Sequence, residues 1–150
     1  MKKFCSILLL CFIQTACVED YNTYFPVYQV NFQINLATGG LALNGIGGYY
    51  VKDPKNTVGT DKIGCGGVLV YHTAIDTYSA FDLACPVEVS RSYLISTPDS
   101  KGIVTCSKCG STFNIFHGMG NPESGPAVEK KRMLKSYRTS LSGTMLNVYN

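Results

Sequence analysis

Residues 28–36 read YQVNFQINL, the most regular stretch of this 150-residue chain. Every second residue from Tyr28 to Leu36 is apolar, and the residues between them are Gln or Asn. Because successive side chains of a β-strand point to opposite faces, this period-two pattern predicts a half-buried strand. The stretch therefore favours a β-rich fold in which one face of this strand covers a core.

The rest of the chain reads as further short strands separated by turns. Two apolar runs, residues 66–71 and 78–83, predict a hairpin that turns over residues 72–77. A final hairpin is expected from residues 133–141 and 144–149, although residues 129–134 could instead form one helical turn. Other short strands are expected at residues 93–96, 103–105 and 112–116. Many short strands with frequent turn signals predict an all-β fold, a small antiparallel sandwich or barrel.

Composition agrees with this fold class and excludes several others. Hydrophobic residues make up 45% of the chain and charged residues 15%, which is too apolar for a disordered protein. Fifteen glycines and ten tyrosines, with few Glu and Lys, disfavour a helical bundle. The formal charge of +3 is too small to indicate a nucleic-acid partner.

The N-terminus has the pattern of an export signal. Lys2 and Lys3 precede an apolar run of eight residues, 6–13, and small or polar residues then lead to Cys17. A cysteine at this place resembles the lipobox of bacterial lipoproteins, except that Gln14 stands where leucine is usual. The resemblance implies a signal peptide over 1–16, an acylated Cys17, a tether over 17–26 and a domain over 27–150. The product would be an exported, membrane-anchored lipoprotein, periplasmic or on the outer surface; plain secretion and an uncleaved anchor are the alternatives.

The remaining cysteines suggest a metal site. Cys85 is followed after a 20-residue gap by Cys106-Ser-Lys-Cys109, and Gly110 comes next. Two cysteines with this spacing before a glycine form a knuckle that can direct both sulfurs at one ion, and thiolates select zinc, iron or an iron–sulfur cluster. The same spacing also serves redox disulfides, and an exported protein could simply hold a structural disulfide. The third cysteine favours the metal interpretation.

These segments resemble the Rieske iron–sulfur family, whose two cluster loops follow the pattern Cys-x-His, a gap, and Cys-x-x-His. Residues 85–87 stand in the place of the first motif and residues 106–109 in the place of the second. Ser111 follows as in the family's second loop, and Pro126 lies in a segment that resembles the loop covering the cluster. The resemblance spans about residues 64–150. It implies a Rieske-like domain with a cluster-binding subdomain of two loops, in which Ser111 and Pro126 lie beside a [2Fe–2S] cluster.

The departures from the family pattern concern the ligands themselves. Val87 stands in place of the first histidine and has no lone pair, and Cys109 stands in place of the second. The resemblance thus gives Cys85 and Cys106 to an inner iron, and Cys109 with one vacancy to an outer iron. Three residues could fill that vacancy, and each also has a plainer interpretation. Glu88 would be a solvated loop acid, Cys65 a buried small residue and His117 an exposed turn residue. His72 is expected at a hairpin tip.

Three functions remain open from the sequence. The first is one-electron transfer through a modified [2Fe–2S] cluster to an unknown redox partner, by an electron-transfer component rather than a stand-alone enzyme. Thiolate in place of imidazole adds negative charge, so this cluster would have a lower potential than an ordinary Rieske centre. The second is a structural zinc or iron ion on the same three cysteines. The third is a metal-free surface lipoprotein with a binding or scaffold role, in which Cys85 is bridged to Cys106 or Cys109.

Overall fold

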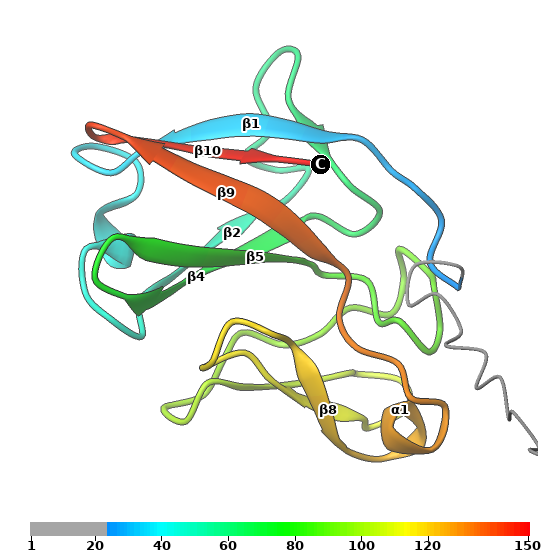
Figure 1. The fold of residues 1–150 in the computed structure, drawn as a ribbon. Helices are drawn as coiled ribbons and strands as arrows, with labels where there is room; N and C mark the ends of the chain where they lie inside the picture. Colours follow the sequence, from blue (N-terminus) through cyan, green and yellow to red (C-terminus); the bar gives the residue numbers. More distant parts are fainter. Residues whose placement is uncertain (1–23) are drawn as a thin grey trace, which may run out of the picture.

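The computed structural model describes residues 24–150, so the expected signal peptide, Cys17 and most of the tether lie outside the described residues. The described part is almost entirely β, as the sequence predicts (Figure 1). Ten strands, one 3-10 helix and one short α-helix follow one another along it. They are β1 (Val30–Asn35), η1 (Leu41–Leu43), β2 (Tyr49–Lys52), β3 (Lys62–Ile63), β4 (Val68–Ala74), β5 (Thr77–Asp82), β6 (Ile103–Thr105), β7 (Thr112–Asn114), β8 (Asn121–Ser124), α1 (Pro126–Glu129), β9 (Ser136–Ser142) and β10 (Met145–Tyr149).

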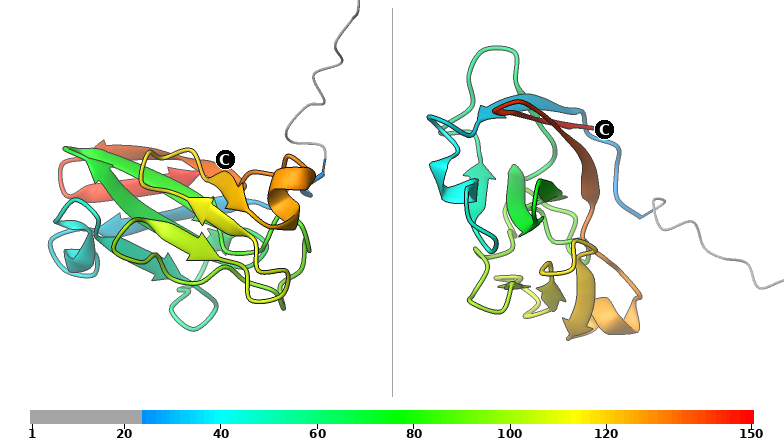
Figure 2. Two further views of the ribbon diagram at one scale, coloured as in Figure 1. Left: turned by 90° about the horizontal axis from the view of Figure 1, so that it is seen from below. Right: turned by 60° about the vertical axis from the view of Figure 1, so that its left-hand side comes forward.

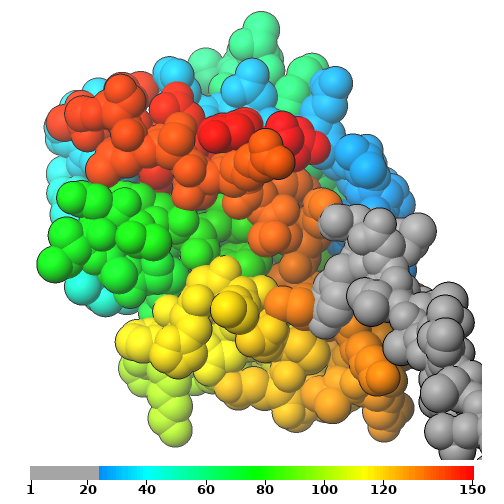
Figure 3. All heavy atoms as spheres, viewed as in Figure 1, coloured from blue at the N-terminus to red at the C-terminus, as the bar shows by residue number. Residues whose placement is uncertain are grey.

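Seven strands form one antiparallel sheet in the order β2-β4-β5-β9-β10-β1-β3, which curls into a nearly closed barrel. A second sheet of three short strands, β6-β7-β8, lies with α1 below the barrel in the view of Figure 1. The right-hand view in Figure 2 shows this small lobe as a separate layer, and Figure 3 shows it packed against the barrel without a break. The chain leaves the barrel after β5 and returns to it at β9, so the small lobe is an insertion between two paired strands.

The strand predicted from residues 28–36 is confirmed as β1. Val30, Phe32 and Ile34 are buried while the residues between them face outward. β1 pairs along its length with β10, the last strand of the chain. The alternation therefore supplies one wall of the barrel core, whose buried members are Val30, Phe32, Ile34, Leu36, Leu43, Val68, Val70, Tyr78, Ala80, Tyr137, Leu146 and Val148.

The hairpin predicted around residues 72–77 exists, but its turn is shorter than expected. β4 continues to Ala74, which pairs with Thr77 across the two residues Ile75 and Asp76. Asp76 adopts a positive φ of 52°, as one residue of so tight a turn requires. The prediction that His72 lies at the hairpin tip is wrong: it is buried in β4 and stacks on Tyr78 with ring centroids 4.5 Å apart.

Other boundaries also differ from the sequence prediction. β2, β3 and β8 were not expected, and residues 93–96 form isolated bridges instead of a strand. The helical turn considered as an alternative for residues 129–134 does not form there; a short helix, α1, precedes it at Pro126–Glu129. Pro126 occupies its first turn, where a residue without an N–H is tolerated. Among residues 24–150, no helix is long and apolar enough to cross a membrane.

Candidate metal centre

A short extended segment around Leu94 holds the two cysteine loops side by side. Leu94 bridges to Ala84 on the first loop, and Ile95 bridges to Cys106 on the second. The Cys85 N–H donates to the Tyr93 carbonyl at 3.0 Å, and the Ser107 N–H donates to the Leu94 carbonyl at 3.2 Å. Because both loops bond to one short segment, residues 93–95, backbone hydrogen bonds hold the loops side by side.

A buried carboxylate fixes the start of the first loop. Asp82 ends β5, is fully buried, and accepts N–H hydrogen bonds from Cys65, Gly66 and Ala84 at 2.7 to 2.9 Å. The Tyr137 hydroxyl donates a fourth hydrogen bond at 2.7 Å. Burial raises the pKa of Asp82, and the four donors oppose part of that increase. Since Ala84 immediately precedes Cys85, this cluster positions the first cysteine relative to the barrel.

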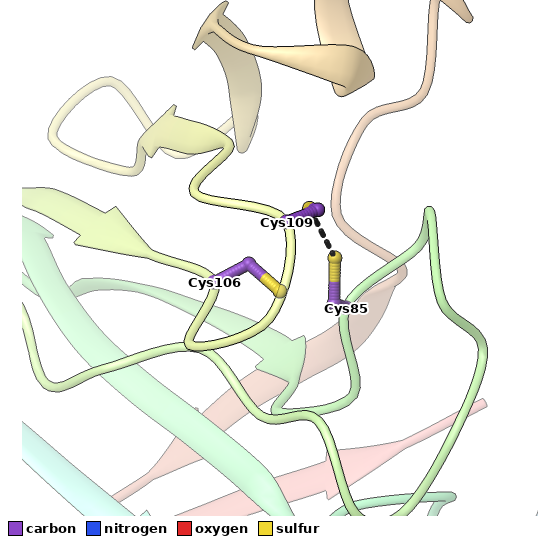
Figure 4. A group of neighbouring side chains, drawn as sticks. All are labelled: Cys85, Cys106 and Cys109. Carbon is purple, nitrogen blue, oxygen red and sulfur yellow. Dashed lines mark hydrogen bonds between the residues drawn. The ribbon is translucent and has the colours of Figure 1, made fainter.

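The three cysteines predicted to act together do meet. The sulfurs of Cys85, Cys106 and Cys109 all lie within 4.8 Å of one another (Figure 4). The pair from different loops, Cys85 and Cys109, has its sulfurs 3.7 Å apart. All the cysteines described are free thiols, and this group could hold a metal ion.

Backbone N–H groups face each of the three sulfurs. The N–H groups of Val87 and Glu88 point at the Cys85 sulfur, and the N–H of Lys108 lies 3.4 Å from the Cys106 sulfur. The N–H of Ser111 faces the Cys109 sulfur. Hydrogen bonds of this kind stabilise the negative charge of a thiolate, the form of cysteine that binds metals. The turns after Cys85 and Cys106 are therefore built as thiolate-binding knuckles.

The cysteines of the group differ in exposure, and the pKa values of Cys85 and Cys109 shift in opposite directions. Cys85 and Cys106 are buried, whereas Cys109 is partly exposed. Burial raises the pKa of the Cys85 thiol strongly, and its neighbour Cys106 adds to the effect. Burial also works to raise the pKa of Cys109, but hydrogen bonds with the side chain and backbone of Ser111, and with the thiols of Cys106 and Cys85, together outweigh it, so the net shift is downward. Without a cation, Cys109 therefore ionises more readily than Cys85.

Ser111 joins the knuckle to the covering segment at residues 125–127. Its hydroxyl oxygen lies 3.1 Å from the Cys109 sulfur and accepts the N–H of Ala127 at 3.0 Å. Gly125 packs so closely on Ser111 that an added Cβ would lie 2.9 Å from the serine Cα. Pro126, half-buried, lies between these two contacts and begins α1. The segment that the Rieske resemblance assigns to cluster covering therefore lies against the serine beside Cys109.

None of the residues considered for the vacant position joins the group of sulfurs. Cys65 is buried, as predicted, and packs with Phe25 and Ala84 in a separate cluster. His117 is exposed, also as predicted, and Glu88 contributes its N–H rather than its carboxylate. Within residues 24–150, the group of side chains able to share one ion consists of the three cysteines alone.

Two features of the site were not predicted from the sequence. The joining segment at residues 93–95 is too short for its sequence pattern to show that it bonds to both cysteine loops. Asp82 gave a weak signal, an acidic residue at the end of an apolar strand, which is unusual because buried carboxylates need several donors.

The chain matches no family model, no curated protein and no solved structure. The likeness to Rieske proteins thus remains a resemblance of motifs, and the site has to be interpreted from its own geometry.

Proposed function

We propose that this protein binds a single soft metal ion through the thiolates of Cys85, Cys106 and Cys109. The observation that supports the proposal most directly is the convergence of three sulfurs from two turns within 4.8 Å, in a domain where backbone N–H groups face each of them. Thiolates favour zinc, iron or copper(I) over hard ions such as magnesium and calcium. The ion would join the two loops and so brace the small lobe.

The spacing of the sulfurs favours one ion over a two-iron cluster. Around a tetrahedral zinc with Zn–S bonds of roughly 2.3 Å, two sulfurs lie about 3.8 Å apart. The Cys85–Cys109 separation of 3.7 Å is close to that value, and the other two sulfur pairs lie within 4.8 Å. In a [2Fe–2S] cluster with the assignment given above, these two residues would bind different irons, and the bridging sulfides would hold them farther apart. The two imidazoles of an ordinary Rieske centre are also missing, since Val87 and Cys109 occupy their places.

An electron-carrying protein with a modified [2Fe–2S] cluster is the second candidate. The burial of the cysteines favours it: Cys85 and Cys106, assigned to the inner iron, are enclosed, and Cys109, assigned to the outer iron, is partly exposed. An exposed outer iron is where an electron partner would approach. Such a cluster would have a midpoint potential below about +100 mV, because thiolate replaces imidazole, and a higher value would contradict this candidate.

One preparation distinguishes the two candidates. The full chain, purified without oxygen in detergent, is analysed for metals and acid-labile sulfide, and its visible spectrum is recorded. We expect one zinc or iron ion and no sulfide; two irons with two sulfides and visible charge-transfer bands would establish the cluster instead. Cys85→Ser should abolish metal binding in either case. Cys65→Ser is the matched control, because Cys65 is an equally buried cysteine outside the site.

We further infer export and anchoring from the N-terminal pattern. The basic start, the apolar run and Cys17 support cleavage before that cysteine and its acylation. Acylation would hold the domain at a bacterial membrane surface by burying hydrocarbon, at ~0.8 kcal/mol per methylene. Incorporation of labelled fatty acid tests this: wild-type chain should carry label and Cys17→Ser should not. An equally labelled Cys17→Ser chain would refute the assignment.

A further inference from the structure

The three cysteines are arranged for a reaction as well as for metal binding. Cys109 is the partly exposed member, whereas Cys85 and Cys106 are enclosed in the core of the small lobe. A disulfide that approaches from solvent therefore meets the sulfur of Cys109 first. Access is one of the factors that set which thiol attacks in thiol–disulfide exchange, and here it favours Cys109.

A sulfur from the other loop lies in contact with Cys109, and the Cys106 sulfur is within 4.8 Å as well. Cys85 lies 3.7 Å away, and a disulfide needs its sulfurs about 2.05 Å apart. The knuckle that carries Cys109 has an exposed glycine next to it: an added Cβ at Gly110 would meet no atom within 4 Å. A small movement of this exposed turn would close the gap to Cys85. The sulfur of Cys106 is turned toward the N–H of Lys108 within its own knuckle.

We propose that the metal-free site reduces small disulfides, with Cys109 as the attacking residue and Cys85 as the resolving residue. The Cys109 thiolate attacks one sulfur of the substrate R–S–S–R, a mixed disulfide forms, and one RS⁻ leaves. The Cys85 thiol loses its proton to solvent and attacks the Cys109 sulfur, which forms the Cys85–Cys109 bond and expels the second RS⁻. The protein loses two electrons and the substrate gains them.

The same reaction controls the metal, a consequence that rests on the proposed metal site. A bridge between Cys85 and Cys109 removes two of three ligands, so the ion leaves and Cys106 remains as a single thiol. One disulfide consumed should release one metal ion. Conversely, a bound ion occupies both reacting sulfurs and should protect them from the disulfide.

The test uses the full reduced chain, stripped of metal by a chelator without oxygen, with hydroxyethyl disulfide as the uncharged substrate. Peptide mass spectrometry locates the products at each cysteine, so reactions of the N-terminal cysteines are counted separately. We expect a Cys85–Cys109 bridge in wild type and in Cys106→Ser, a trapped adduct on Cys109 in Cys85→Ser, and no bridge in Cys109→Ser. Cys65, buried outside the site, should react at least about tenfold more slowly than Cys109.

Two outcomes would overturn the proposal: a Cys106–Cys109 bridge in wild type, or first adducts on Cys85 or Cys106. The effect of the metal is tested in a second experiment, in which zinc is added before the disulfide. Slower bridging, with one zinc released per bridge, supports the control of metal by oxidation. If the chain binds no metal yet forms the Cys85–Cys109 bridge, the proposed metal function fails and the exchange activity stands.

Discussion

Removal of the Asp82 carboxylate should destabilise the whole domain. Its two oxygens accept hydrogen bonds from three backbone N–H groups and from the Tyr137 hydroxyl, all buried. In Asp82→Ala these four donors lose their acceptor, and each buried donor without a partner costs about 1–3 kcal/mol. Water that enters the space recovers part of the loss, so we expect a decrease of about 3–5 kcal/mol in the free energy of unfolding. That is a large share of the roughly 5–15 kcal/mol typical of a domain.

Tyr137→Phe is the matched comparison. It removes one donor and leaves the carboxylate with its three N–H partners, so we expect a loss of only about 1 kcal/mol. Urea unfolding followed by far-UV circular dichroism measures both variants, provided that their m-values agree with wild type. If Asp82→Ala costs no more than Tyr137→Phe, then Asp82 does not organise the backbone of the first cysteine loop, and the reasoning is refuted.

The pH dependence of stability gives an independent check on Asp82. Burial raises its pKa, although the hydrogen bond from Tyr137 and the backbone donors oppose this. The native state therefore keeps a proton that the unfolded chain, with a carboxyl pKa near 3.9, has already released. This contribution to stability is complete at low pH and is lost as the pH rises through the native pKa. The difference between wild type and Asp82→Asn should follow that decline; a difference that grows with pH would contradict it.

Three further predictions concern other parts of the small lobe and barrel. Gly125→Ala should lower the free energy of unfolding by about 2–3 kcal/mol and also lower metal affinity, because the backbone conformation suits only glycine and the added Cβ meets Ser111. Gly110→Ala is the control: it is also at positive φ but in open space, so it should lower the free energy of unfolding by about 1 kcal/mol. His72→Phe should raise the free energy of unfolding by about 1 kcal/mol, since neither buried ring nitrogen has a partner within residues 24–150; a loss of stability would contradict this. A chelator should lower the melting temperature of the metal-loaded wild type and leave that of Cys106→Ser unchanged. Where free metal had been 100 times its Kd, removal of the metal should lower the free energy of unfolding of the wild type by about 2.7 kcal/mol.

The sequence predicts strands in both parts of the fold, including β6 and β7 of the small lobe, and misses β2 and β3 of the barrel and β8 of the lobe. β1 is recognised because its alternation of apolar and amide side chains reports directly on a wall with one buried face. β8 is missed because its residues, Asn121–Ser124, are mostly exposed and include a proline, so no hydrophobic pattern marks it. The predicted position of the turn between β4 and β5 is wrong because His72, a polar residue, is buried in the strand and stacks on Tyr78. Pattern identifies strands that cover a core, and tertiary contacts decide the rest.

The candidate site shows the same division. Which cysteines act together follows from the sequence, because the knuckle spacing and the earlier cysteine suggest a shared ion. Which pair of sulfurs is in contact does not follow, because it depends on the joining segment. That segment bonds Cys85 to Tyr93 and Ser107 to Leu94, and so brings Cys109 to Cys85 across the loops. The contact between Cys85 and Cys109 therefore joins residues 24 apart in the sequence, and the more local Cys106 lies within 4.8 Å of both.

This arrangement explains how metal binding and disulfide exchange can share one site. The two loops are held together by backbone hydrogen bonds and by the Asp82 cluster, neither of which needs an ion. In the proposed site the sulfurs would therefore stay close with or without an ion, at a spacing that suits a tetrahedral ion and lies one short movement from a disulfide. A site that folds only around its metal would lose this second reaction, because its cysteines would separate when the ion left. The preformed scaffold is what makes the two chemistries alternatives at the same three sulfurs.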